Sequence, residues 1–176
     1  MSFDIMDRAP EVAAFAAFVA ALVPWSVSFS GGGFAESVIL RFVFGSLELS
    51  FGARSTDMTH TALSITDVGS QYGGDLAQVG TLWLVAAALL AVALALALAL
   101  VVAGERLVVG GFDPVRAMGA LCLGMALCLS GAAWLLWRNT PEVPVPVGLV
   151  VCYLFGAGLL TIDRARAGRA STEASG

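Results

Sequence analysis

One uncharged stretch of the sequence decides the expected fold: 77-AQVGTLWLVAAALLAVALALALALVVAG-104 contains no Asp, Glu, Arg or Lys. About 20 apolar residues are enough for a helix to cross the hydrocarbon core of a bilayer. The Ala-Leu alternation from Ala91 to Leu100 has the period of a strand, but both residues are apolar and both are strong helix formers. The sequence therefore predicts a membrane-spanning helix over residues 76–103, long enough to tilt or to extend beyond the bilayer.

The composition of the whole chain supports the same interpretation. Of the 176 residues, 59% are hydrophobic and 12% are charged, and the mean hydropathy is +0.89. A water-soluble fold of this length cannot hide so much apolar surface. We therefore expect an all-α membrane protein of four transmembrane helices, with a small external β hairpin or three-stranded sheet between the first and second spans.

Three further apolar segments complete the expected four-helix bundle. They cover residues 1–27 together with the N-terminus, residues 115–137 and residues 145–162. The competing interpretation of the first segment is a cleaved signal peptide, but its start is acidic rather than basic. Tryptophan favours the membrane interface, and the residues expected to act as interfacial anchors are Trp25, Trp134 and Trp137.

The arginines predict the orientation in the cell membrane. All nine basic residues are arginine, and they are outnumbered by 13 acidic residues, which argues against nucleic-acid binding. Six arginines fall on the side that holds both termini, which the positive-inside rule makes cytoplasmic: Arg8, Arg106, Arg116, Arg164, Arg166 and Arg169. The remaining segments follow as a β-rich external segment (28–75), a cytoplasmic loop (104–114), an external turn (138–144) and a disordered cytoplasmic tail (163–176).

The external segment carries a hairpin pattern. Two runs rich in β-branched and aromatic residues flank Gly45-Ser46, which we predict to be a two-residue turn. Residues 59–68 have enough β-branched residues for a third strand. This predicted hairpin places apolar side chains on one face, and we expect that face to form an external contact surface of Phe42, Phe44, Leu49 and Phe51.

Small residues repeat every four positions on the last two spans. Such ridges let helices approach closely, so we predict that the third and fourth spans pack through them, with an oligomer interface as the alternative. The residues are Ala120, Gly124 and Cys128 on one span, and Gly148, Cys152 and Gly156 on the other.

No catalytic, cofactor-binding or metal-binding group is expected. His60 is the single histidine, and the three cysteines all lie in predicted spans, so a zinc site lacks ligands. The Gly31-Gly32-Gly33 run lacks the Lys-Ser/Thr of a phosphate-binding loop. The predicted spans also contain no ionisable residue away from their ends, which argues against transport by the chain alone.

The order of these elements resembles two groups of membrane proteins. The architecture is similar to that of the claudin-like class, which has a first span, a β-rich external segment and three further spans; here the first span ends in Trp25 and the external segment has about fifty residues. The claudin signature motif is not present, because Phe44-Gly45-Ser46-Leu47 does not match it and the external segment has no cysteine. The lysine-free, acidic composition and the Pro24-Trp25 exit resemble small uncharacterised four-span membrane proteins of halophilic archaea.

These observations predict a non-enzymatic membrane protein. Its external β segment would contact a protein or the cell envelope, and its partners would be the lipid bilayer and either another membrane protein or a second copy. The alternative is an accessory subunit of a transporter, channel or other membrane complex, whose partner supplies the missing polar pathway.

Overall fold

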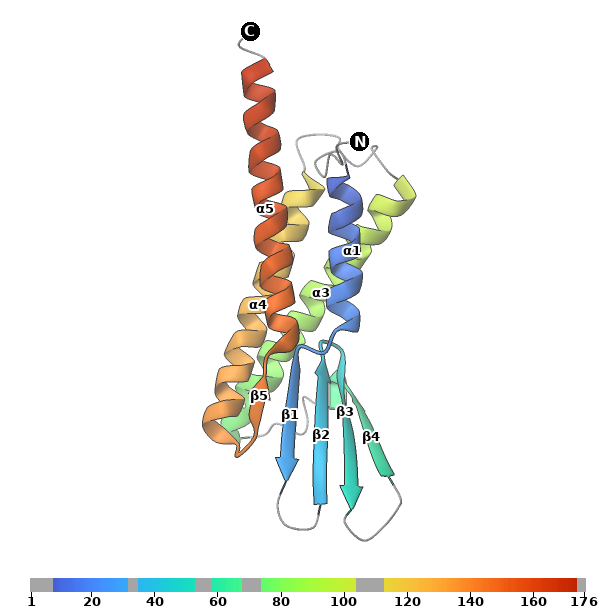
Figure 1. The fold of residues 1–176 in the computed structure, drawn as a ribbon, viewed down its shortest axis with the longest axis vertical. Helices are drawn as coiled ribbons and strands as arrows, with labels where there is room; N and C mark the ends of the chain where they lie inside the picture. Colours follow the sequence, from blue (N-terminus) through green and yellow to red (C-terminus); the bar gives the residue numbers. More distant parts are fainter. Residues whose placement is uncertain (1–7, 32–34, 53–57, 68–73, 104–112, 174–176) are drawn as a thin grey trace.

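A helical layer and a β-sheet lie end to end along the long axis of the protein (Figure 1). The computed structural model describes residues 8–31, 35–52, 58–67, 74–103 and 113–173. The helix α1 begins, and the helix α5 ends, at the end of the molecule away from the sheet. The chain therefore passes from the helical layer into the sheet and returns from it.

Four long helices form the helical layer: α1 (Ala9–Leu22), α3 (Ala77–Ala103), α4 (Pro114–Asn139) and α5 (Val147–Glu173). A short 3-10 helix, η1 (Gly74–Leu76), leads into α3. Helix α4 has a well-formed start, because Asp113 accepts hydrogen bonds from the backbone N–H groups of Val115 and Arg116, at 2.8 and 3.3 Å. Pro114 follows at the first helical position, where its missing N–H costs nothing.

Five antiparallel strands form one sheet in the order β4-β3-β2-β1-β5. They are β1 (Ser26–Gly31), β2 (Ala35–Phe42), β3 (Gly45–Gly52), β4 (Met58–Ser64) and β5 (Val143–Val145). Strands β1 to β4 follow one another as hairpins between α1 and α3. Strand β5 comes from the connection between α4 and α5, more than a hundred residues later, and pairs with β1.

The predicted fold class is wrong. The structure is mixed α/β rather than all-α, since a five-stranded sheet replaces the expected hairpin or three-stranded sheet. The prediction of a bundle of four membrane spans is also wrong, because among the described residues only α3 and α4 are long and apolar enough to cross a membrane by length and composition. Helix α1 has 14 residues and is about 21 Å long, short of the roughly 30 Å hydrocarbon core.

The hairpin of β2 and β3 turns two residues earlier than the sequence pattern suggested. Phe42 pairs with Gly45, so the turn is formed by Val43 and Phe44 rather than by Gly45-Ser46. Gly45 is needed for another reason: a Cβ atom there would lie 2.4 Å from the carbonyl oxygen of Leu63 on the neighbouring strand. The register moves by an even number of residues, so the faces of both strands are those expected.

The last helix extends beyond its expected end. Residues 163–173, which we predicted to belong to a disordered tail, continue α5 as far as Glu173. Alanine and arginine, which dominate this part of the chain, are both strong helix formers. Residues 174–176, the rest of the predicted tail, and the expected loop at 104–112 lie outside the described residues.

The core begins where the helices meet the sheet. Trp25, which follows α1, packs edge-on against Trp83 of α3, with ring centroids 5.2 Å apart, and both indoles are buried. The Trp83 Nε1–H donates to the carbonyl oxygens of Phe42 and Val43, at 3.0 and 2.9 Å. A second core cluster fills the other end of the helical layer, where the alanines of α1 allow close contact with α3 and α4.

The start of α5 lies directly against the exit of α1. The Gly148 N–H donates to the carbonyl oxygen of Pro24 at 3.1 Å, and a Cβ atom at this position would come within 2.6 Å of the same oxygen. At Gly158, further along α5, an added Cβ meets no atom within 4 Å. The two glycines form a matched pair on one helix.

Alanine substitutions at these two positions should have opposite effects. We expect Gly148→Ala to destabilise the protein by about 1–3 kcal/mol, because backbone atoms must move apart. Gly158→Ala should stabilise it by up to about 1 kcal/mol through helix propensity. Thermal unfolding of the two variants beside the parent chain tests this, and equal midpoints for both variants would contradict it.

Candidate functional site

The two faces of the sheet differ in chemistry. One face, which we call the outer face, carries two rows of side chains that cross all five strands in register. The row nearer the helices contains Val145, Val27, Leu40, Leu47 and Ala62, and the next row contains Val143, Phe29, Val38, Leu49 and His60. Nine of these ten residues are apolar. Each is exposed or half-buried, and none is buried.

The opposite face is polar and is partly buried. Ser26, Ser28 and Arg41 all point to this side, and each is 3% exposed or less. Arg41 lies on β2 directly across from Ser26 of β1. A buried arginine must be paired, because its guanidinium cannot lose its proton in a protein.

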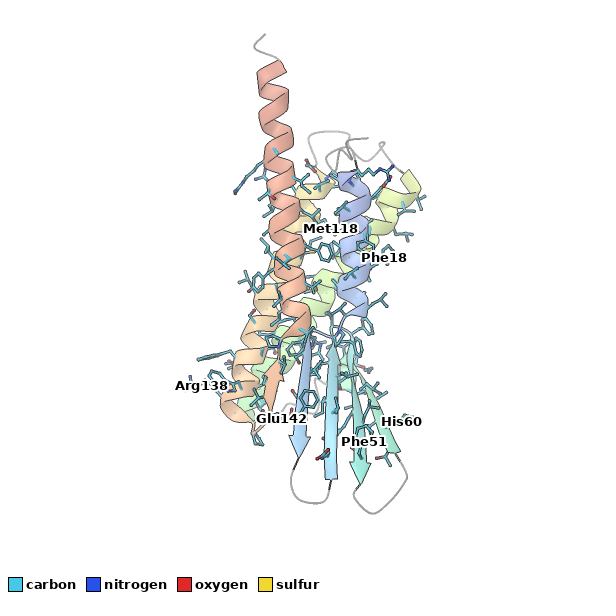
Figure 2. All side chains as sticks on the ribbon, in the orientation of Figure 1. Phe18, Phe51, His60, Met118, Arg138 and Glu142 are labelled. Carbon is cyan, nitrogen blue, oxygen red and sulfur yellow. The ribbon has the colours of Figure 1, made fainter. Side chains whose placement is uncertain are left out.

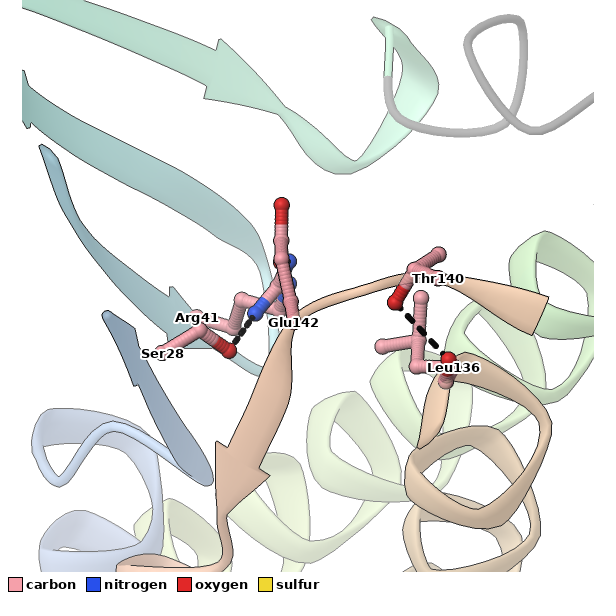
Figure 3. Close-up of polar contacts among 5 residues, drawn as sticks. All are labelled: Ser28, Arg41, Leu136, Thr140 and Glu142. Atoms are coloured by element: carbon pink, nitrogen blue, oxygen red, sulfur yellow. Dashed lines mark hydrogen bonds and ion pairs between the residues drawn. The ribbon is translucent and has the colours of Figure 1, made fainter. Parts of the chain in front are cut away.

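Glu142 supplies the counter-charge for Arg41 (Figure 3). The Arg41 Nη2 donates to the Glu142 Oε2 at 2.5 Å, and the Arg41 Nη1 donates to the Ser28 Oγ, also at 2.5 Å. Arg41 is 3% exposed and Glu142 is 23% exposed, so the carboxylate reaches solvent and the guanidinium does not. This ion pair joins two segments that are 101 residues apart in the sequence.

The end of α4 aims Glu142 at the sheet. Both the backbone N–H and the hydroxyl of Thr140 donate to the carbonyl oxygen of Leu136, at 2.9 and 2.8 Å, and this caps the last turn of α4 (Figure 3). The chain then leaves in an extended conformation and enters β5, where Pro144 pairs with Ser28. The ion pair and β5 therefore attach the connection between α4 and α5 to the sheet.

Several buried polar atoms near this ion pair make no hydrogen bond to the described part of the chain. They are the Trp25 Nε1, the Ser26 Oγ and the Arg41 Nε. The carboxylate already faces the guanidinium, so the arrangement is a closed pair rather than an open anion site. It supports a structural role for the polar face.

The residues predicted as an external contact surface divide into two groups. Leu49 and Phe51 lie on the outer face, with Phe51 exposed towards the end away from the helices (Figure 2). Phe42 and Phe44 lie beside the helix junction, where their rings stack at 6.1 Å. The pairing of the strands therefore extends the predicted surface to residues of β1, β2, β4 and β5.

The predicted packing ridges meet several different neighbours. On α4, Gly124 faces Leu89 of α3, Ala120 is exposed and Cys128 is half-buried. On α5, Gly148 lies against Pro24, and Gly156 lies against Leu123 of α4, 2.7 Å from an added Cβ. Cys152 is buried in the core cluster at the junction.

The tryptophans predicted as interfacial anchors lie in two environments. Trp25 lies in the core rather than on the surface, because its ring packs on Trp83. Trp134 and Trp137 are both more than half exposed near the end of α4, with ring centroids 5.4 Å apart. The Arg138 guanidinium lies 6.0 Å from the Trp134 ring centroid, at cation–π distance.

Residues with metal-binding or nucleophilic chemistry are dispersed. His60 is exposed on β4, and the three cysteines are free thiols on α4 and α5. In the described ranges, no three His, Cys, Asp or Glu side chains come together as metal ligands would.

Sequence patterns could have found part of this site. Ser26-Val27-Ser28-Phe29-Ser30 alternates polar and apolar residues, which is typical of a half-buried strand, and Val143-Pro144-Val145 has the same period. The predicted boundaries instead divide the first segment between the first span, which ends at residue 27, and the β-rich external segment. They divide the second between the external turn, which ends at residue 144, and the last span. The pairing of Arg41 with Glu142 left no signal in the sequence, because it depends on β5 joining the sheet.

The fold and this site define a mixed α/β protein with two long apolar helices and a five-stranded sheet whose outer face is apolar. The chain belongs to a family of unknown function, DUF7549, which matches residues 6–164. This match covers the helical layer as far as Arg164 and the whole sheet. No curated protein matches the chain.

Proposed function

We propose that this protein is held in a membrane by α3 and α4 and presents its sheet outside the bilayer as a contact surface. The observation that carries the membrane proposal is the small buried fraction of its most apolar segments. Only 28% of the most apolar window of α3 and 39% of that of α4 are buried inside the protein. The core helix of a soluble protein would be mostly buried, whereas a lipid-facing helix exposes apolar side chains.

Exposed apolar side chains surround the helical layer. They occur on α1, α3, α4 and α5, and the largest exposed fractions include those of Leu22, Leu98, Val102, Leu127 and Leu154. Exposed apolar surface on this scale marks contact with a membrane or a partner. A bilayer around α3 and α4 would cover the exposed apolar side chains of these two helices.

The direction of the helices supports a multi-pass arrangement with both termini in the cytoplasm. Helix α3 leaves the sheet and α4 returns to it, so the two helices would cross in opposite directions (Figure 1). Arg8 and Arg116 begin α1 and α4 at the end away from the sheet, and Arg164 lies on α5 at the same end. The positive-inside rule makes that end cytoplasmic and the sheet external.

The contact function is supported by the outer face of the sheet. Two adjacent rows of mostly apolar side chains, each exposed or half-buried, would be costly across five strands without a partner. We propose a non-enzymatic role in which this face binds protein or envelope material. The order of elements, a helix, a β-rich segment and further helices, supports the likeness to the claudin-like class in architecture alone.

The alternative role, an accessory subunit of a membrane complex, is favoured by one polar pair. The hydroxyls of Ser130 on α4 and Tyr153 on α5 lie 3.0 Å apart. Tyr153 is exposed, whereas Ser130 is half-buried and also donates to the carbonyl oxygen of Ala126 at 2.8 Å. Hydroxyl groups on a lipid-facing surface can hydrogen-bond a neighbouring membrane helix.

Cysteine labelling in intact cells tests the membrane proposal. In a chain without its three cysteines, we would introduce Thr61→Cys on β4, Arg164→Cys on α5 and Leu98→Cys on α3, one at a time. A membrane-impermeant maleimide should label Thr61→Cys from outside and Arg164→Cys only after lysis. Leu98→Cys should stay unlabelled throughout, although its side chain is exposed on the protein.

Two outcomes would contradict this proposal. Labelling of Leu98→Cys as fast as that of Thr61→Cys would show that α3 is not in lipid. Labelling of Arg164→Cys in intact cells would place the end of α5 outside.

A further inference from the structure

The outer face carries no carboxylate in its two rows, although the chain as a whole is acidic. The protein has 13 acidic and 9 basic residues and a net charge of −4, yet neither row of the outer face contains a carboxylate. Glu36 is the nearest acidic residue of this face, beyond the second row at the end away from the helices. Two copies of a protein with net negative charge repel each other where acidic side chains meet, and contact through this face avoids such a meeting.

We propose that two copies of this protein pack their outer faces against each other, which rests on the proposed function of that face. Copies held in one membrane share the same orientation, so a closed pair requires a two-fold axis along the membrane normal. The strands run close to the long axis of the molecule (Figure 1). Facing strands of the two copies therefore run in the same direction, as in an aligned sandwich.

The position of the axis follows from the strand order. Strand β2 is the middle strand, so an axis beside it lets all five strands of each copy overlap with the other copy. Val38 then faces Val38 of the second copy, and Leu40 faces Leu40. Phe29 on β1 faces Leu49 on β3, so the largest side chain of the row meets a leucine on both sides of the axis.

The size of the outer face suits such a pair. The five strands contain between three and eight residues each. At about 3.4 Å per residue and about 4.8 Å between strands, the sheet covers about 500 Å². Specific dimers bury about 800 Å² on each partner. The sheet would supply most of that area, and the exposed aromatic and aliphatic side chains at the junction would add to it.

Chemical cross-linking in native membranes tests this pairing, in the chain without its own cysteines. Packed sheets lie about 10 Å apart, too far for a direct disulfide, so the reagent is a short bis-methanethiosulfonate. We expect Val38→Cys to give a covalent dimer in most of the protein. The neighbouring residue on the opposite face, Ile39→Cys, should give at least ten-fold less, and a mixture of Phe29→Cys with Leu49→Cys chains should cross-link as well.

Labelling of Phe29→Cys by an impermeant maleimide separates this proposal from the contact function. A Val38→Cys dimer with slow Phe29→Cys labelling supports both. If Val38→Cys gives no dimer while Phe29→Cys is labelled at least ten-fold more slowly than Thr61→Cys, the partner is a different molecule and self-association is overturned. If no dimer forms and both cysteines react at equal rates, the outer face is uncovered, and both proposals are overturned.

Discussion

Replacing Glu142 with alanine should destabilise the protein by about 3–5 kcal/mol, the range found when one partner of a buried ion pair is removed. Arg41 is 3% exposed and would keep its charge, with Ser28 as its remaining side-chain partner. The loss comes from the buried, unpaired cation and also from the release of β5. It should appear as a lower midpoint of thermal unfolding.

Replacing Arg41 instead should cost much less. Arg41→Met keeps the apolar stem and removes the buried charge, and the remaining Glu142 is 23% exposed and can be hydrated. The double variant Arg41→Met/Glu142→Ala should therefore recover most of the stability lost in Glu142→Ala. A double variant less stable than Glu142→Ala alone would contradict the assignment of the loss to the buried cation.

Replacing Trp83 with alanine should destabilise the protein by a similar amount, about 3–5 kcal/mol. Its indole is fully buried, packs on Trp25 and donates to the carbonyl oxygens of Phe42 and Val43. The substitution opens a cavity at the junction and leaves the turn between β2 and β3 without this donor. Thermal unfolding, with the protein in the same lipid or detergent as the parent, measures the effect.

Two further variants separate the ring from its hydrogen bonds. Trp83→Phe keeps much of the ring but removes the N–H, so it should lose about 1–3 kcal/mol. Trp137→Ala removes an indole that is 56% exposed and should change stability by less than about 0.5 kcal/mol. Equal losses for Trp83→Ala and Trp137→Ala would show that the junction is not the core of the protein.

The stability of the junction bears on the proposed contact function. The polar face of the sheet is fixed to the helical layer through Arg41 and Glu142, and α3 is fixed to the turn between β2 and β3 through Trp83. None of these contacts uses a side chain from the two rows of the outer face. A sheet held in this way can present an apolar face outside a membrane without turning that face onto its own helices.

Local sequence patterns were sufficient to predict the apolar helices and the faces of β2 and β3. A long uncharged run such as that of α3 forms a helix wherever its backbone groups cannot bond to water. The same reasoning predicts the helix α4 from its apolar composition. The alternation of side chains in β2 and β3 likewise determined which residues share a face, because the predicted pairing is wrong by four residues, an even number that preserves the faces. Hydrophobic period and helix or strand propensity are local properties of the sequence, so they do not depend on contacts with distant segments.

The tertiary structure alone decided the sheet as a whole. Strand β5 has three residues and β1 has six, and neither is stable until it pairs with a neighbour. The turn of the β2–β3 hairpin was decided by the close approach of Leu63 to Gly45 and by the Trp83 hydrogen bonds, both of them contacts between distant segments. The Arg41–Glu142 ion pair and the outer face depend on the same pairing, since a sheet assembled from distant strands acquires its surfaces only when those strands come together.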